Sequence, residues 1–176
     1  VFADPATVPR EVRTDLAIND SFLVPAGASN FRVDFWRAFD RDSLILSFMP
    51  HMHLRGKAFR YELKYPDGHI EALLDIPRYD FNWQNTYELA EPKFVPKGAK
   101  LHCIAHFDNS EDNLANPDPA HAVGWGEQTW EEMMIGWFVR TNVDEVPNLP
   151  AALEAKDRES AKAAPATKPV SKTAPV

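Results

Sequence analysis

The chain has 176 residues, 44% of them hydrophobic, which is enough apolar mass for one hydrophobic core but not for two full domains. Its 19 Lys and Arg residues against 26 Asp and Glu residues give a formal net charge of −7, which argues against nucleic acid as a partner. No apolar run approaches the roughly 20 residues needed to cross a bilayer, so we expect no membrane span. The single cysteine, Cys103, excludes an internal disulfide.

Short segments rich in β-branched and aromatic residues follow one another along the chain. The 15 prolines and 7 glycines fall mostly between these segments, as turn residues do. In chain order, the predicted strands cover residues 16–22, 29–36, 43–53, 59–65, 70–76, 86–94, 100–107 and 132–141. About eight such strands predict an all-β chain folded as an antiparallel β-sandwich of the jelly-roll type.

Composition divides the chain into three parts. Residues 1–13 form a lead-in or linker, residues 14–150 form the folded domain, and residues 151–176 form an Ala/Lys/Pro-rich tail with almost no large apolar side chain. Such a tail cannot bury a core, so we expect a marginal helix over 151–162 and a disordered tether after it. The sequence starts at Val1 rather than at a methionine, which indicates a processed protein or a segment of a longer one.

The longest turn region is a polar stretch over residues 108–120, which contains Asn116-Pro117-Asp118-Pro119. It is too long for a hairpin connection. A loop of this length on a rigid β scaffold is a common place for binding residues, and an ordinary surface excursion fits the same sequence equally well.

The most informative segment is the predicted strand over residues 43–53, which ends in His51-Met52-His53. Because strand side chains alternate between two faces, His51, His53 and Met49 point the same way, with Ser47. The opposite face is apolar and holds Leu44, Leu46, Phe48, Met52 and Leu54. Two imidazoles about 7 Å apart along a strand can converge on one metal ion, and imidazole suits copper and zinc alike.

A third ligand would distinguish the two metals. The candidates are Met133 and Met134, which follow the acidic pair Glu131-Glu132 at the start of the last predicted strand. A thioether is soft, so a methionine beside two histidines favours copper, and Cu(I) in particular. The alternative interpretation makes the histidines a polar strand face and the methionines core residues.

Other polar residues have weaker signals. His102 and His106 share one face of their strand and are candidates for a second pair of metal ligands. His106 alone is also a candidate for a fourth ligand of the copper site, or for a hydrogen-bond partner of one of its ligands. A solvent-facing strand histidine is the simpler interpretation of each. Glu131 and Glu132 are candidates for orienting a ligating imidazole, although charged residues at the start of a strand are usually solvated.

The region over residues 14–142 resembles the C-terminal domain of the ascorbate-dependent type II copper monooxygenases, the family of peptidylglycine α-hydroxylating and dopamine β-monooxygenases. The shared pattern runs from Val24-Pro25-Ala26-Gly27 through His-x-His with a closely following Gly56-Lys57, then Pro96-Lys97-Gly98, the Cys103 strand and Glu132-Met133. The resemblance implies one copper ion held by His51, His53 and Met133, with Met134 as the second choice. It also implies insertion of one oxygen atom from O₂ into a C–H bond, and a secreted or periplasmic location.

Three departures from the family's pattern limit what the resemblance implies. Met134 stands where the family has the cysteine that pairs with the position of Cys103, so we expect a looser strand pair there. Met49 and Trp137 stand where the peptide-hydroxylating member has the arginine and tyrosine that anchor its substrate, which disfavours a glycine-extended peptide and leaves these two residues as a possible pocket. The electron-storing copper domain is not in this chain, so the reductant would be ascorbate or a partner redox domain.

Two alternatives to a monooxygenase stay open at this point. One is a copper-binding or copper-storage module that uses the same three ligands without turnover. The other is a structural β-sandwich domain of a larger secreted protein, in which the two histidines bind nothing. The substrate is not indicated by the sequence under any of these interpretations.

Overall fold

The computed structural model describes residues 11–145 and shows an all-β chain with one short 3₁₀ helix, η2 (Val143–Glu145). The predicted tail, with its predicted helix, lies outside the described residues. The strands are β1 (Arg13–Asn19), β2 (Leu23–Val24), β3 (Phe31–Ala38), β4 (Ser43–His51), β5 (Gly56–Lys64), β6 (Ile70–Ile76), β7 (Tyr87–Val95), β8 (Lys100–Phe107), β9 (Val123–Gly124) and β10 (Met134–Asn142).

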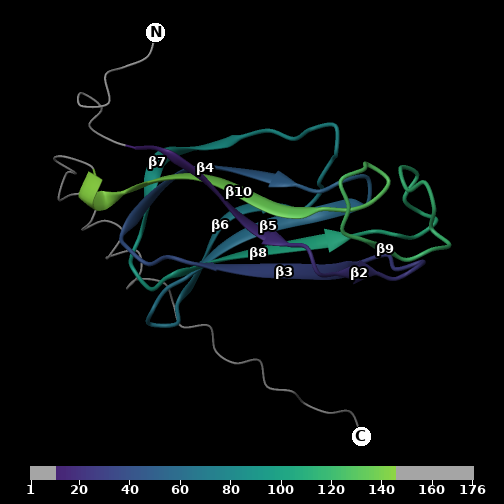
Figure 1. The fold of residues 1–176 in the computed structure, drawn as a ribbon, viewed down its shortest axis with the longest axis horizontal. Helices are drawn as coiled ribbons and strands as arrows, with labels where there is room; N and C mark the ends of the chain where they lie inside the picture. Colours follow the sequence, from purple (N-terminus) through teal and green to yellow (C-terminus); the bar gives the residue numbers. More distant parts are fainter. Residues whose placement is uncertain (1–10, 146–176) are drawn as a thin grey trace, which may run out of the picture.

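Two antiparallel four-stranded sheets lie face to face, as Figure 1 shows. The first has the order β1-β10-β4-β7 and the second has the order β3-β8-β5-β6, while β2 and β9 pair with each other. When the eight long strands are counted in chain order, these orders are 1-8-3-6 and 2-7-4-5. That is jelly-roll connectivity, in which neighbouring strands of one sheet are far apart in the sequence. The predicted fold class is therefore confirmed.

The bounds of the strands agree with the sequence patterns to different degrees. The strands β6 and β8 have the predicted bounds, and the other long strands differ by a few residues at one or both ends. The pair β2–β9 was not predicted, because two residues are too few for an alternating pattern. Gly27, Gly68 and Gly98 have φ values of 68°, 91° and 86°, which fits the turns predicted around them.

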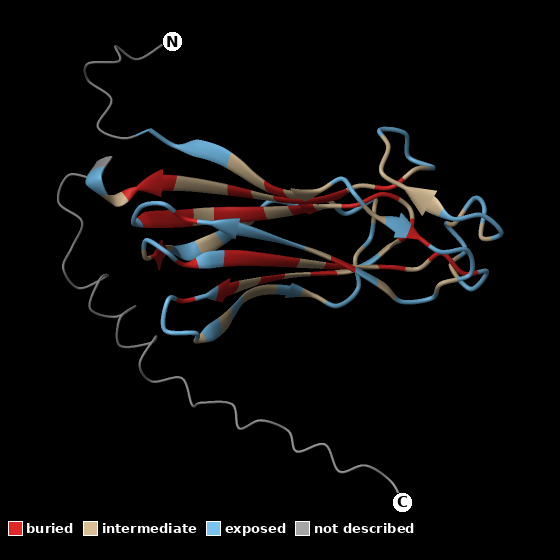
Figure 2. Cartoon of the chain, turned by 60° about the horizontal axis from the view of Figure 1, so that its bottom comes forward, coloured by how far each residue is buried: buried red, intermediate tan, exposed pale blue. Residues whose placement is uncertain are grey.

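The hydrophobic core lies between the two sheets. Its largest fully buried aromatic side chains come from both layers: Phe48 and Phe138 from the first sheet, and Phe59, Tyr61 and Phe107 from the second. Figure 2 shows that buried residues concentrate on the long strands, whereas exposed residues concentrate in the loops. Among residues 11–145, no helix is long and apolar enough to span a membrane.

The alternation in β4 is interrupted, which corrects one prediction. The register between β4 and β7 shifts between Ile45 and Ser47, so Ile45 is fully buried in the main core together with Phe48. Leu44 packs in a separate small cluster with Phe94, and Leu46 is half-buried. The predicted single apolar face is wrong before Ser47, because a bulge moves side chains from one face to the other. The alternation holds from Phe48 to Met52.

The looser strand pair expected near Cys103 stays a prediction, and the structure shows how closely that residue is packed. The thiol is free and fully buried, and it faces Gly136 of β10 across the two layers. A Cβ at position 136 would lie 2.6 Å from Cys103 Sγ and 3.0 Å from Tyr61 Cε1, so only glycine fits. The two layers are therefore in close contact where Cys103 faces Gly136.

Candidate metal centre

The two histidines singled out by the sequence lie at the end of β4, on the face of the sheet that points away from the core. His51 is half-buried and is the last residue of β4, and His53 follows it with 4% exposure. Met52 between them is fully buried in the core, which directs both imidazoles to the outer face. Their ring centroids are 5.1 Å apart and the ring planes are nearly perpendicular, at 88°.

Each imidazole has a carbonyl oxygen next to its Nδ1 atom. His51 Nδ1 lies 2.5 Å from Gln84 Oε1, and the Gln84 amide nitrogen donates to the carbonyl of Phe81, which fixes the orientation of the amide. His53 Nδ1 lies 3.2 Å from the carbonyl oxygen of Glu131. A carbonyl oxygen can only accept, so in the neutral form of each ring Nδ1 carries the proton and Nε2 keeps a lone pair. A histidine that ligates a metal normally makes a second hydrogen bond of this kind.

The connection between β6 and β7, residues 77–86, holds this end of β4 in place. The Tyr79 hydroxyl accepts from the Met52 amide at 3.0 Å and donates to the Met52 carbonyl at 2.8 Å, and burial raises the pKa of Tyr79 to about 12. The Phe81 ring contacts His53 edge-on, with centroids 6.0 Å apart. One loop therefore fixes the backbone between the two histidines and contacts both imidazoles.

Burial and charge both act on His53. Its pKa is lowered, mainly by burial and to a smaller extent by the neighbouring His51, while the carbonyl groups of Glu131 and Gln128 oppose the shift. Desolvation disfavours the imidazolium form. The neutral ring is the form that binds a metal.

Strand register separates the two candidate methionines. Ile135 is the partner of His51 in the β10–β4 pair, so continuing the register places Met134 opposite Met52 and Met133 opposite His53. Met134 is fully buried in the core with Met52, whereas Met133 is half-buried and precedes β10. Residues directly opposite in an antiparallel pair share a face. Met133 is therefore the methionine on the histidine face.

Glu132 is fully buried, although the sequence suggested a solvated side chain. Its carboxylate accepts from the backbone N–H of His53 at 2.9 Å and from that of Arg55 at 2.6 Å. Burial raises the pKa of Glu132 to about 7, and the two N–H donors and the Arg55 guanidinium oppose that shift. This carboxylate ties the backbone beside Met133 to the backbone of the histidine segment.

Arg55 and Asn109 continue the same network into the predicted polar loop. Arg55 is 2% exposed, and it donates from Nε to Asn109 Oδ1 at 2.7 Å and from a terminal nitrogen to the Trp130 carbonyl at 2.9 Å. Asn109 is fully buried and donates to the carbonyls of Pro25 and His121. Burial lowers the pKa of Arg55.

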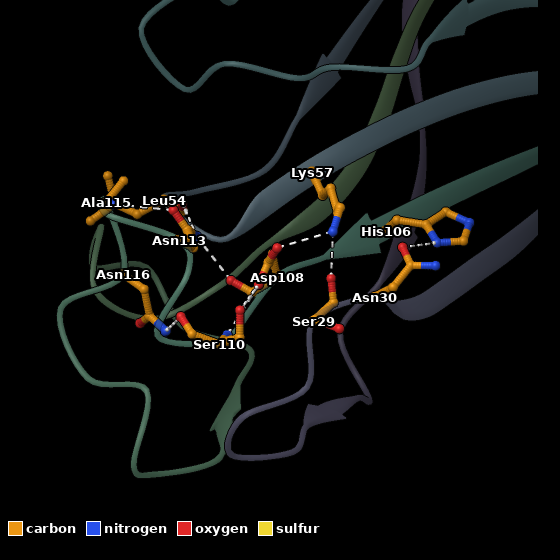
Figure 3. A network of polar contacts seen from close by, with 10 residues as sticks. All are labelled: Ser29, Asn30, Leu54, Lys57, His106, Asp108, Ser110, Asn113, Ala115 and Asn116. Atoms are coloured by element: carbon orange, nitrogen blue, oxygen red, sulfur yellow. Dashed lines mark hydrogen bonds and ion pairs between the residues drawn. The ribbon is translucent and has the colours of Figure 1, made fainter.

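The loop that follows β8 is held together by its own Asp and Asn side chains. Asp108 accepts from Ser110, Asn113 donates to the carbonyls of Asp108 and Leu54, and Asn116 donates to the carbonyl of Ser110 (Figure 3). Asn116 also donates to Asn109 Oδ1. The bond to Leu54 attaches the loop directly after His53. The loop therefore supports the histidine segment. Whether it also carries binding residues stays a prediction.

The possible pocket residues Met49 and Trp137 are cross-strand partners on the same outer face as the histidines. Leu16 of β1 is the next partner in that row, and Ile18, Ile135 and His51 form the adjacent row. Met49 and Trp137 are both half-buried. The surface beside the imidazoles is therefore apolar and carries no arginine or tyrosine in these two rows.

The structure does not bring His102 and His106 together or place either beside His51. They are four residues apart on β8, roughly 13 Å at the usual rise of a strand, and they lie on the outer face of the other sheet. His106 Nδ1 lies 3.0 Å from Asn30 Oδ1 (Figure 3). His102 is 6% exposed and contacts Asp34, so it is not the solvent-facing histidine expected.

The residues on the histidine face fit copper. Two imidazoles whose Nδ1 atoms face carbonyl oxygens and one thioether on the same face provide the borderline and soft donors that suit Cu(I). Among residues 11–145 there is no group of three or more His, Cys, Asp or Glu side chains that could hold a metal ion. The donor set thus depends on the methionine.

Comparisons with known proteins add little to this geometry. No protein-family model and no curated protein matches the chain. Among solved structures, it is similar to a chain in "Structure of infectious bursal disease virus Gt strain", at 15% sequence identity and a TM-score of 0.38, covering 87% of this chain and 38% of that chain. This chain thus spans well under half of that chain's length, and a TM-score this low supports no argument about function.

Several supporting residues were missed by sequence reasoning, and three of them show why. Gln84 and Tyr79 lie in a connecting loop about thirty residues after the histidines and match no motif, so no local signal marked them. Asn109 had a usable signal, because it begins a run of Asp, Asn and Pro residues directly after a strand. Glu132 was considered as a residue that orients an imidazole, and the structure shows it bonded to backbone instead.

Proposed function

We propose that this domain binds one copper ion through His51, His53 and Met133 and inserts one oxygen atom from O₂ into a C–H bond of a substrate. The observation that carries the proposal is the pair of imidazoles whose Nδ1 atoms face carbonyl oxygens, which leaves two Nε2 lone pairs on the face that also holds Met133. The resemblance to the copper monooxygenases supports the same three ligands.

The roles of the residues follow from their contacts. Gln84 and the Glu131 carbonyl keep the imidazoles in the tautomer that can ligate, and Phe81 shields His53 from water. Glu132 keeps the backbone beside Met133 against that of His53. Copper, when bound, supplies the oxygen chemistry, and ascorbate or a partner redox domain supplies the electrons. A secreted or periplasmic location belongs to the same proposal.

The substrate that this surface favours is apolar near the carbon that reacts. The row formed by Leu16, Trp137 and Met49 lies beside the row that contains His51, and it offers apolar contact without a cation that would hold a carboxylate. A small hydrocarbon or aromatic group therefore fits this face better than a peptide with a free terminal carboxylate.

The experiment is X-ray absorption at the copper edge on Cu(I)-loaded full chain, with His51→Ala, His53→Ala, Met133→Ala and Met134→Ala variants. We expect one sulfur scatterer in the parent protein, lost in Met133→Ala and kept in Met134→Ala, and weaker copper binding in both histidine variants. Met134→Ala is the matched control because it removes a thioether from the core.

The alternatives make different predictions in the same experiment. A sulfur signal that survives Met133→Ala, or stoichiometric binding that ignores both histidine changes, contradicts the ligand set. Absence of stoichiometric copper binding supports a structural β-sandwich. Tight binding without oxygen consumption under ascorbate, and without product from hydrocarbon or aromatic substrates, supports a copper-binding module without turnover.

A further inference from the structure

A second surface, independent of the copper site, lies on the outer face of the sheet β3-β8-β5-β6. A hollow of about 470 Å³ is lined by Trp36, Lys64, Tyr65, Pro66, Gly98 and Lys100. These residues come from the end of β3, the end of β5 with the turn after it, and the start of β8 with the turn before it. Because β5 and β8 run between this hollow and the histidine segment, the two surfaces lie at opposite ends of the domain.

Trp36 in this hollow is exposed but firmly held. Its side chain is 41% exposed, and one face of the ring stacks on His102 with centroids 3.7 Å apart and planes 7° from parallel. His102 is in turn fixed by Asp34, 3.0 Å from Nε2, and by Glu62, 3.6 Å from Nδ1. An exposed indole that is already immobilised loses little entropy when a second flat surface packs on it.

The two lysines of the hollow lie opposite each other, so their like charges lower the stability of the protein without a ligand. Lys64 and Lys100 are direct cross-strand partners, and like charges directly opposite each other destabilise a sheet. Among residues 11–144, neither ammonium group forms an ion pair, whereas several other surface cations, such as Arg60 and Lys57, do. The Lys64 ammonium lies over the Trp36 ring, 5.9 Å from its centre, as a cation–π contact, so a ring that packs on Trp36 must move this flexible side chain aside. Two unpaired positive charges beside an exposed indole are the complement of an anionic ring.

We propose that this hollow binds an acidic oligosaccharide, with a sugar ring packed on Trp36 and a uronate carboxylate held by Lys64 and Lys100. A pyranose ring presents a flat face of C–H groups to an indole, and a carboxylate accepts from both ammonium groups. Nucleic acid is the less suitable polyanion, because a chain of net charge −7 repels a long run of phosphates outside this small basic area.

The test uses the full chain and measures binding by calorimetry and by tryptophan fluorescence. The probes are tetragalacturonic acid, neutral cellotetraose and a single-stranded oligonucleotide. We expect binding of the tetragalacturonic acid, at least tenfold weaker binding of cellotetraose, and weakening of the former by salt. Equal binding of the neutral sugar, or tighter binding of the oligonucleotide, overturns the proposed ligand class.

Variants locate the site and separate it from effects on folding. Trp36→Ala and Lys64→Gln should each weaken tetragalacturonic acid binding by roughly tenfold, equivalent to 1.4 kcal/mol. Lys100→Glu should abolish binding and yet raise the melting temperature by roughly 1–3 °C, because it replaces a like-charge pair with an opposite-charge pair. A variant that merely unfolds cannot show that combination.

Matched controls lie on another part of the surface. Trp83→Ala removes an indole that is 67% exposed, and Arg78→Gln removes an exposed positive charge, both in the loop over residues 77–86. Both should leave binding unchanged. No binding of tetragalacturonic acid by the parent chain, or binding that survives Trp36→Ala and Lys100→Glu, refutes the site whatever the outcome of the copper experiments.

Discussion

The outer faces of the two sheets each present histidines, and the partners of those histidines differ. On the sheet β1-β10-β4-β7, each imidazole of His51 and His53 meets a neutral carbonyl oxygen at Nδ1. On the sheet β3-β8-β5-β6, His102 lies between the carboxylates of Asp34 and Glu62 and under the ring of Trp36. On the first sheet, each histidine thus has one ring nitrogen beside a carbonyl oxygen. On the second sheet, both ring nitrogens of His102 lie beside carboxylates.

This difference shows how a strand histidine can be assigned from its neighbours. A carbonyl oxygen fixes the tautomer without adding charge, so the ring stays neutral and one nitrogen remains able to ligate. Carboxylate oxygens beside both ring nitrogens occupy both positions through which a histidine can ligate, so neither nitrogen is open to a metal. The position of the histidine on an outer strand face is the same in both cases and does not distinguish them.

The largest expected effect comes from the buried carboxylate that supports the histidine face. Glu132→Ala should lower the free energy of unfolding by about 3–5 kcal/mol, because it leaves two buried backbone N–H groups without their acceptor and removes the carboxylate whose charge interacts with the buried Arg55 guanidinium. Urea denaturation of the metal-free protein measures it. On the other face, Asp34→Ala should cost less than about 1 kcal/mol, since that carboxylate is 40% exposed. Equal losses of stability in the two variants would contradict the proposed difference between the two sheet faces.

The next effect tests which methionine belongs to the histidine face. Met134→Ala should destabilise the metal-free protein by about 2–4 kcal/mol because Met134 is fully buried in the core. Met133→Ala, at a half-buried position, should cost under about 1 kcal/mol. Thermal or urea unfolding of both variants measures the difference. The reverse order of stability would mean that the register continued from β10 does not hold at Met133.

A smaller effect sharpens the contrast between carbonyl and carboxylate partners, and it depends on copper binding. Gln84→Leu removes the acceptor at His51 Nδ1 and should weaken copper binding by about 10- to 100-fold. Asp34→Asn changes the partner of His102 and should leave copper affinity unchanged. Competition with a Cu(I) chelator measures both. Unchanged affinity in Gln84→Leu would remove the proposed role of the carbonyl partner.

The smallest effect concerns pH and His106. Its pKa is lowered, first by burial and then by Arg32 and Lys57, so between pH 7 and 5 the unfolded chain binds a proton more readily than the folded one. The stability attributable to His106 is therefore present above the unfolded pKa near 6.5 and falls as the pH drops below it. His106→Gln should flatten that part of the stability profile. An unchanged slope would show that other groups cause it.

The fold could be predicted from the sequence to a large extent because most strands here alternate and end in turn residues. The bulge near Ile45 could not, since it depends on how β4 aligns with β7, and the sequence of β4 alone does not contain that alignment. The ribbon β2–β9 joins two residue pairs about a hundred positions apart, and neither has a pattern of its own.

The candidate site divides in the same way. The two histidines follow from alternation within one strand, and Met52 in the core agrees with it. The proposed preference for Met133 over Met134 rests on the register of β10 against β4, which the sequence does not contain. Gln84 and Glu132 act across 33 and 79 residues of sequence, on His51 and His53 respectively, so only the assembled sheet reveals them.

The pairing of the first strand with the last has a consequence for how the chain folds. Within residues 11–145, β1 (Arg13–Asn19) has β10 as its single strand partner, and β10 lies between β1 and β4 in the sheet. During synthesis, β1 and one edge of β4 stay unpaired until β10 has left the ribosome. Contacts so distant in sequence make folding slow. We therefore expect that nascent chains ending before β10 require a chaperone and aggregate without one, through two open strand edges.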